Sequence, residues 1–67
     1  MQLYQFLRYI PDNTCIMLFN LKGHCIASVR DKSSINTDLY EEIILEIGLG
    51  DSNINGCKSA IYITLEK

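Results

Sequence analysis

Residues 14–30 read TCIMLFNLKGHCIASVR and decide the fold, because two β-rich runs flank a single turn in this stretch. The runs on either side of Gly23 are rich in the β-branched and aromatic residues that strands favour. A two-residue loop would pair Leu21 with His24, and a three-residue loop would pair Asn20 with His24. Asparagine at the first position of a type I turn and glycine at the fourth favour the three-residue loop. We therefore predict a hairpin in which Asn20 faces His24.

The three-residue register also predicts how the side chains divide between the two faces of the hairpin. Successive strand residues point to opposite faces, so one face is expected to carry only apolar side chains: Cys15, Met17, Phe19, Cys25, Ala27 and Val29. The other face is expected to carry Ile16, Leu18, Asn20, His24, Ile26, Ser28 and Arg30. A slip of one residue would mix the two sets, which favours this register.

The first eleven residues predict an amphipathic helix. Apolar residues recur there at the spacing of one helical face, at Leu3, Phe6, Leu7 and Ile10. Pro11 ends the pattern, because the residue before a proline is disfavoured in the α region.

Residues 38–51, DLYEEIILEIGLGD, fit two structures. As a helix over 38–47 they would have Asp38 as the N-cap and a glycine at the end. As a short helical turn near 36–41 followed by a strand over 43–49, they would pair with the final β-rich run, 58–66. We favour the strand, because the final run needs a neighbour for its backbone hydrogen bonds.

These elements predict a single α+β domain over residues 1–67, with an N-terminal helix packed on a four-stranded, largely antiparallel sheet. The chain is near the lower size limit for a self-sufficient hydrophobic core. No apolar run approaches the ~18 residues of a membrane span. The six Lys and Arg residues are scattered among eight Asp and Glu, so direct nucleic-acid binding is not expected.

Three cysteines, an odd number and far apart in sequence, argue against a disulfide framework. We therefore expect reduced thiols and a cytoplasmic protein. His24 stands next to Cys25, but neighbouring strand residues point to opposite faces, so the imidazole would not activate that thiol. No other catalytic pattern is present, and we expect no enzyme activity.

A zinc site formed by His24, Cys25 and Cys57 is the alternative use of these residues. If the strands form a meander, the 50–57 loop would return to the same end of the sheet as the 21–23 turn. The three donors, completed by water or a carboxylate, would then suit zinc. Otherwise the cysteines are small buried hydrophobes and His24 is an exposed turn residue.

An excess of apolar surface predicts association with another protein. One short helix covers only one face of a four-stranded sheet, and a large exposed apolar patch usually marks an interaction site. If the helix covers the Cys15–Met17–Phe19 face, the residues left for a partner are Ile16, Leu18, Ile26 and Tyr62. Acidic residues would form a rim facing basic side chains of the partner, namely Glu41, Glu42 and Glu46. A homodimer is the alternative way to cover such a patch.

The motif LRYIPDNT (7–14), followed by a hairpin with the turn NLKG (20–23), resembles small proteins of Firmicute phages and prophages. In that group a short helix ends in a YIPDDT-like turn. LYEEIILEIGL (39–49) and AIYITLE (60–66) are similar to the group's acidic turn and third strand and to its closing strand. The resemblance implies the strand structure for 43–49, and it implies no catalytic residues.

The same resemblance implies a function. Small accessory phage proteins of this kind often inhibit host defences, as anti-CRISPR proteins do when they act on an RNA-guided nuclease. We therefore expect a non-catalytic inhibitor that binds a host protein, with a zinc-stabilised structural or regulatory domain, or a self-associating module, as alternatives. His24, Cys25 and Cys57 depart from the group's pattern, which favours the zinc hypothesis for this chain.

Overall fold

The computed structural model describes all residues from Met1 to Lys67 and is an α+β fold, as predicted. One α-helix and two 3-10 helices pack on a four-stranded sheet of order β2-β1-β4-β3. The elements are α1 (Leu3–Leu7), β1 (Ile16–Phe19), β2 (Cys25–Val29), η1 (Lys32–Ser34), η2 (Thr37–Leu39), β3 (Ile44–Asp51) and β4 (Ser59–Leu65). No helix is long and apolar enough to cross a membrane.

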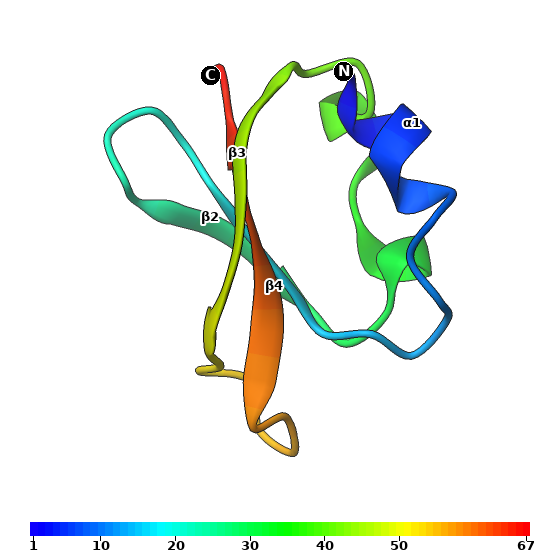
Figure 1. The fold of residues 1–67 in the computed structure, drawn as a ribbon, viewed down its shortest axis with the longest axis vertical. Helices are drawn as coiled ribbons and strands as arrows, with labels where there is room; N and C mark the ends of the chain where they lie inside the picture. Colours follow the sequence, from blue (N-terminus) through cyan, green and yellow to red (C-terminus); the bar gives the residue numbers. More distant parts are fainter.

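The centre of the sheet is a parallel pair. β1 runs parallel to β4, whereas β1–β2 and β3–β4 are antiparallel. The prediction that the final strand pairs with 43–49 is confirmed, but the expected meander is wrong, because β4 inserts between β1 and β3. Figure 1 shows α1 and the two 3-10 helices on one side of the sheet, with the turn between β3 and β4 projecting beyond them.

The hydrophobic core lies between the sheet and the helical layer. The four sheet residues at its centre are fully buried: Ile16, Leu18, Ile63 and Leu65. Buried residues from the helical layer and the segments next to it complete the cluster: Leu3, Leu7, Ile10 and Ile35. Each such side chain contributes about 1.5–3 kcal/mol on burial, so this face carries most of the stability of a small domain.

The predicted hairpin turn is confirmed, but the predicted division of side chains is wrong. Asn20 N–H donates to His24 O at 3.0 Å, and Gly23 adopts a positive φ of 81°. A β-bulge then shifts the pairing, so that Phe19 faces Cys25 whereas Leu18 faces Ala27. A bulge inserts one extra residue into one strand. Beyond it, each residue of β1 shares a face with the β2 residues that the regular register would place on the opposite face.

As a result, Ile16 and Leu18 lie on the buried face, opposite Val29 and Ala27. The pairing with β4 selects this face, because Ile16 is aligned with Ile61 and Leu18 with Ile63. The expectation that Ile16 and Leu18 are exposed is therefore wrong.

The helical segments are shorter than the sequence pattern predicted. α1 ends at Leu7, and Lys32 Nζ donates to the carbonyl oxygens of Leu7 at 3.1 Å and Ile10 at 2.7 Å. Because the last carbonyls of a helix have no partner within it, this lysine satisfies two backbone acceptors at the end of the helical segment. The helical turn expected near 36–41 is confirmed by η2, and the long-helix alternative over 38–47 is wrong, because β3 occupies Ile44–Asp51.

Cys15 and Cys57 form a disulfide, with their Cα atoms 6.5 Å apart. The expectation of three reduced thiols is therefore wrong, and Cys25 is the one free cysteine. The cause is the parallel pairing: Cys15 O accepts a hydrogen bond from Ile61 N–H at 2.9 Å, so the residues that precede β1 and β4 lie side by side.

Removing this cross-link should lower the free energy of unfolding. The disulfide joins residues 42 apart in sequence, and closing a loop of that length restricts the unfolded chain by roughly 2–4 kcal/mol. We expect the Cys15→Ser, Cys57→Ser double variant to unfold at a lower urea concentration by about that free energy. Cys25→Ser is the matched control and should leave the midpoint unchanged. Equal midpoints for the double variant and the wild type would contradict the cross-link.

On the sheet face away from the helix, the Tyr62 side chain packs against the backbone of β3. Its ring centroid is 5.0 Å from that of Phe19, and its hydroxyl donates to Asp51 O. A Cβ added to Gly50 would lie 2.5 Å from the Tyr62 ring, whereas a Cβ added to Gly48 would meet nothing within 4 Å. Gly50 therefore makes room for Tyr62, and Gly48 does not.

The two glycines give a matched pair of variants. Gly50→Ala should displace Tyr62 and lower the free energy of unfolding by about 1–3 kcal/mol, the usual effect of overpacking. Gly48→Ala should be neutral or slightly stabilising, because the methyl group enters open space and alanine restricts the unfolded chain. Urea denaturation of both variants measures the difference. A Gly50→Ala midpoint equal to that of Gly48→Ala would contradict this packing.

Candidate functional site

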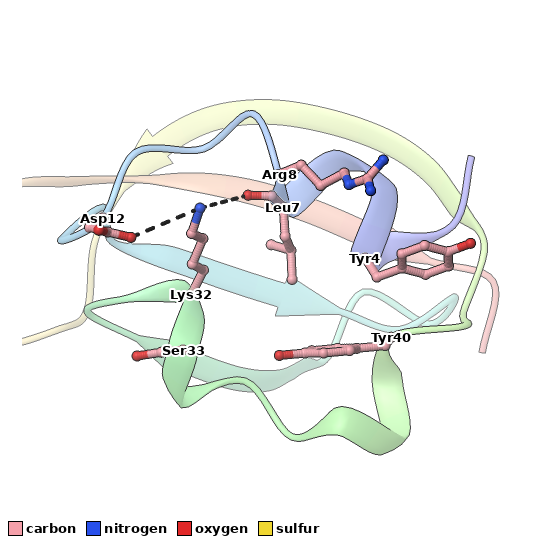
Figure 2. Close-up of a pocket in the computed structure, with 7 residues that line it drawn as sticks. All are labelled: Tyr4, Leu7, Arg8, Asp12, Lys32, Ser33 and Tyr40. Atoms are coloured by element: carbon pink, nitrogen blue, oxygen red, sulfur yellow. Dashed lines mark hydrogen bonds and ion pairs between the residues drawn. The ribbon is translucent and has the colours of Figure 1, made fainter.

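A pocket of about 300 Å³ opens between α1 and the segment that carries the two 3-10 helices. Figure 2 shows its lining residues: Tyr4, Leu7, Arg8, Asp12, Lys32, Ser33 and Tyr40. The volume is at the lower end of the range of about 300–1,000 Å³ for ligand pockets. This size suits one side chain or a small group better than a large cofactor.

Two backbone connections hold the pocket walls together. Tyr4 N–H donates to Tyr40 O at 3.0 Å, and Leu3 N–H donates to Glu42 O at 2.9 Å. These bonds join the start of α1 to the segment after η2. The two tyrosines therefore come from segments far apart in sequence but directly connected through their main chains.

Lys32 holds the opposite end of the pocket. Its ammonium group bonds the two carbonyls at the end of the helical segment and lies 3.9 Å from a carboxylate oxygen of Asp12. Figure 2 shows the ammonium group between Asp12 and the Leu7 carbonyl. Since two of its three N–H donors bond main-chain carbonyls and its charge is paired with Asp12, Lys32 mainly builds the pocket wall.

Asp31 fixes the start of η1 behind this wall. Its carboxylate accepts hydrogen bonds from the Ser33 hydroxyl, from Asn13 N–H at 2.5 Å and from Ser33 N–H at 3.0 Å. These bonds stabilise the ionised form and lower the pKa of Asp31 from 3.8 to about 2. Asn13, which has a positive φ of 62°, is thereby tied to the loop that leads into η1.

Arg8 is the free charge at the pocket. Its guanidinium group has no acidic partner within 4.0 Å and no hydrogen bond within the chain. In Figure 2 it extends away from Asp12, on the side of the pocket where Tyr4 lies. Tyr4 has 40% of its surface exposed, and Tyr40 is half-buried. Tyrosine and arginine are the side chains most often found at binding hot spots, and here they surround an existing pocket.

The residues predicted to bind zinc are not brought together. Cys57 is bonded to Cys15 beside the start of β1, whereas Cys25 begins β2, which runs antiparallel to β1 from its other end. His24 is an exposed turn residue whose N–H donates to Asn20 Oδ1 at 3.0 Å. The Cys25 thiol is exposed and donates to Ala27 O at 3.4 Å. No group of three or more His, Cys, Asp or Glu side chains in the structure is arranged to hold a metal ion.

The residues predicted to bind a partner are dispersed. Ile16 and Leu18 are fully buried, and Tyr62 is half-buried under its contact with Phe19. Ile26 is exposed on β2, and Glu46 is exposed on β3. Glu41 and Glu42 lie between η2 and β3, where Glu41 is exposed and Glu42 half-buried. The predicted patch therefore does not exist as one surface.

The pocket residues escaped the sequence analysis for a specific reason. Tyr4 and Arg8 are four residues apart, so the helical spacing already places them on one face of α1. Nothing in the sequence, however, indicates that Tyr40 comes to lie against that face. The connection depends on the backbone pairing between the N-terminus and the segment after η2.

No family model, curated protein or solved structure matches the chain. The resemblance to phage proteins therefore stays a prediction.

The Asp31 network predicts a defined loss of stability in acid. A carboxyl group whose pKa is lowered in the folded state stabilises the fold above its unfolded pKa of 3.8 and loses this effect as the pH falls toward about 2. We expect the melting temperature of the wild type to fall more steeply between pH 4 and pH 2 than that of Asp31→Asn. Asp38→Asn, at an exposed aspartate in the same connector, is the control. Parallel curves for the wild type and Asp31→Asn would contradict the network.

Proposed function

We propose that this protein is a non-catalytic inhibitor that binds a host protein, with the pocket between α1 and η2 at the centre of its interface. The observation that carries the proposal is the pocket itself, of about 300 Å³, with Tyr4, Tyr40 and an unpaired Arg8 around it. A partner side chain inserted there would pack against two aromatic rings and could accept hydrogen bonds from the guanidinium group.

The surface around the pocket extends this interface. Tyr9 follows Arg8 at the end of the helical segment and is 77% exposed. Glu41 follows Tyr40 and is also exposed. Exposed tyrosines supply apolar contact area with a polar tip, which suits a protein interface, and the charges at the rim affect the rate and specificity of association. The net charge of −2 suits a basic partner.

The identity of the partner rests on the resemblance alone. Small phage proteins of the anti-CRISPR type bind RNA-guided nucleases, which are large and basic, and such a nuclease fits the charge of this chain. The host cytoplasm would then be the site of action. Because that compartment is reducing, the Cys15–Cys57 disulfide makes it necessary to measure binding with and without reductant.

A titration of DNA cleavage by a panel of RNA-guided nucleases tests this proposal. We expect inhibition of one nuclease to be complete at a fixed ratio of protein to nuclease and not to increase with incubation time, as simple occupancy requires. Arg8→Glu and Tyr4→Ala should each weaken inhibition at least about tenfold, which is the loss of a hot-spot contact.

Two variants at the β1–β2 turn, away from the pocket, serve as controls. Leu21→Ala removes an exposed apolar side chain, and Lys22→Glu makes the same charge reversal as Arg8→Glu. Both should inhibit more strongly than the pocket variants. Full inhibition by Arg8→Glu and Tyr4→Ala would contradict the pocket as the interface, and inhibition at ratios far below one would contradict a non-catalytic mechanism. No effect on any nuclease in the panel would count against this class of partner.

A further inference from the structure

The outer edge of β3 is the second unusual surface of this protein. β3 pairs with β4 on one side, and on the other side only its start is occupied, where Gln2 bridges Ile43 and Ile44 N–H donates to Met1 O at 2.8 Å. The backbone edge from Leu45 to Asp51 has no strand beside it. Natural proteins usually protect such an edge with lysine, proline or a covering segment, because it can pair with another strand.

The side chains of this edge are apolar and exposed. Ile47 and Leu49 pair with Ile63 and Ile61, so they point to the same face as the core, yet they are 47% and 82% exposed. Leu45 is 51% exposed. Figure 1 shows that α1 does not extend over the part of β3 nearest the β3–β4 turn.

The backbone groups of Ile47 and Leu49 point to the free edge. Ser52 N–H donates to Lys58 O at 3.3 Å, which identifies Ser52 as a residue that bonds toward the β4 side. In an antiparallel ladder, residues with inward and outward hydrogen-bonding groups alternate. The donors and acceptors of Ile47 and Leu49 are therefore available to a new strand, whereas Asp51 O already accepts a hydrogen bond from the Tyr62 hydroxyl.

We propose that two copies of this protein pair through their β3 strands, antiparallel and related by a twofold axis through Gly48. Gly48 is the midpoint of the free segment 45–51, so this register uses all of the open edge. Ile47 then lies opposite Leu49 of the second copy, and the two pairs form an apolar cluster on the helix-bearing face. The outward backbone groups of each strand meet those of the other.

The charges of β3 agree with this arrangement. Glu46 points to the other face of the sheet, where it lies opposite Gly50 of the second copy, and the two Glu46 carboxylates stay four residues apart. Asp51 lies opposite Leu45, so no like charges face each other. Like charges directly opposite would destabilise the pair. The strand can therefore pair with its own antiparallel copy without placing like charges directly opposite.

The dimer should be weak. Stable interfaces bury more than about 1,000 Å² of surface, and a ladder of seven residues buries less than this. We therefore expect a dissociation constant on the order of 100 µM. Sedimentation velocity over a concentration series measures it. Leu49→Lys should keep the protein monomeric throughout, because an edge lysine prevents strand pairing. Leu21→Lys, at a leucine 58% exposed in the β1–β2 turn, is the control and should dimerise as the wild type does.

A cross-linking experiment tests the register in a Cys25→Ser background, which removes the one free thiol. Gly48→Cys should form a disulfide-linked dimer on mild oxidation, because the two Cα atoms would be at a distance suited to a disulfide. A side chain at Gly48 enters open space, so the variant should fold. Glu46→Cys, on the same face, is the control and should stay uncross-linked, because its sulfur atoms would lie roughly 14 Å apart.

The outcomes are distinct. A concentration-dependent dimer that Leu49→Lys abolishes, with cross-linking through Gly48→Cys only, supports the proposal. A monomer at millimolar concentration, a dimer that Leu49→Lys leaves intact, or equal cross-linking of the two cysteine variants overturns it. The pocket variants at Tyr4 and Arg8 lie outside β3, so this result is independent of the inhibitor proposal.

Discussion

The parallel ladder between β1 and β4 is the constraint on which the rest of the structure depends. It aligns Ile16 with Ile61 and Leu18 with Ile63, and so selects the face of β1 that becomes the core. It also places Cys15 beside Cys57. The bulge in the β1–β2 hairpin is a consequence of this alignment. It lets the hairpin keep its preferred turn while Ile16 and Leu18 face the core.

A second set of contacts positions the helical layer over this face. The main chain of residues 1–4 bonds to residues 40–44, and Lys32 bonds to the end of the helical segment. The pocket is the space left between these two attachments. Its walls are therefore fixed by main-chain and buried contacts, whereas the side chains that give it chemical character, Tyr4, Arg8 and Tyr40, have few bonds within the chain.

The local features of the fold could be predicted from the sequence, and the long-range ones could not. Asn20 and Gly23 specify the turn, Pro11 limits the helix, and the need of the last strand for a neighbour identifies β3. Periodicity does not indicate whether a strand pairs in parallel or antiparallel. The expected meander therefore placed Cys57 beside His24 instead of Cys15, which produced the zinc hypothesis. The wrong assignment of Ile16 and Leu18 came from the regular hairpin register, which did not include the bulge.

The same limit explains the candidate site. Helical spacing predicts that Tyr4 and Arg8 share a face, but the second wall of the pocket comes from a segment whose position depends on the assembled sheet. The surface residues that the sequence did suggest for a partner were derived from an assumed buried face. Because the bulge puts Ile16 and Leu18 on the buried face, the proposed patch loses its two central residues.

The central position of β4 has a consequence for how the chain folds. β4 follows the other three strands in the chain and yet lies between β1 and β3, so neither of its neighbours has a complete pairing until β4 forms. Before that, the chain contains only the β1–β2 hairpin and α1, and an isolated hairpin is at best marginally stable. Contacts between residues distant in sequence slow folding, because the entropy of loop closure is lost before they form. Collapse should therefore be concerted, with no stable intermediate before β4 pairs.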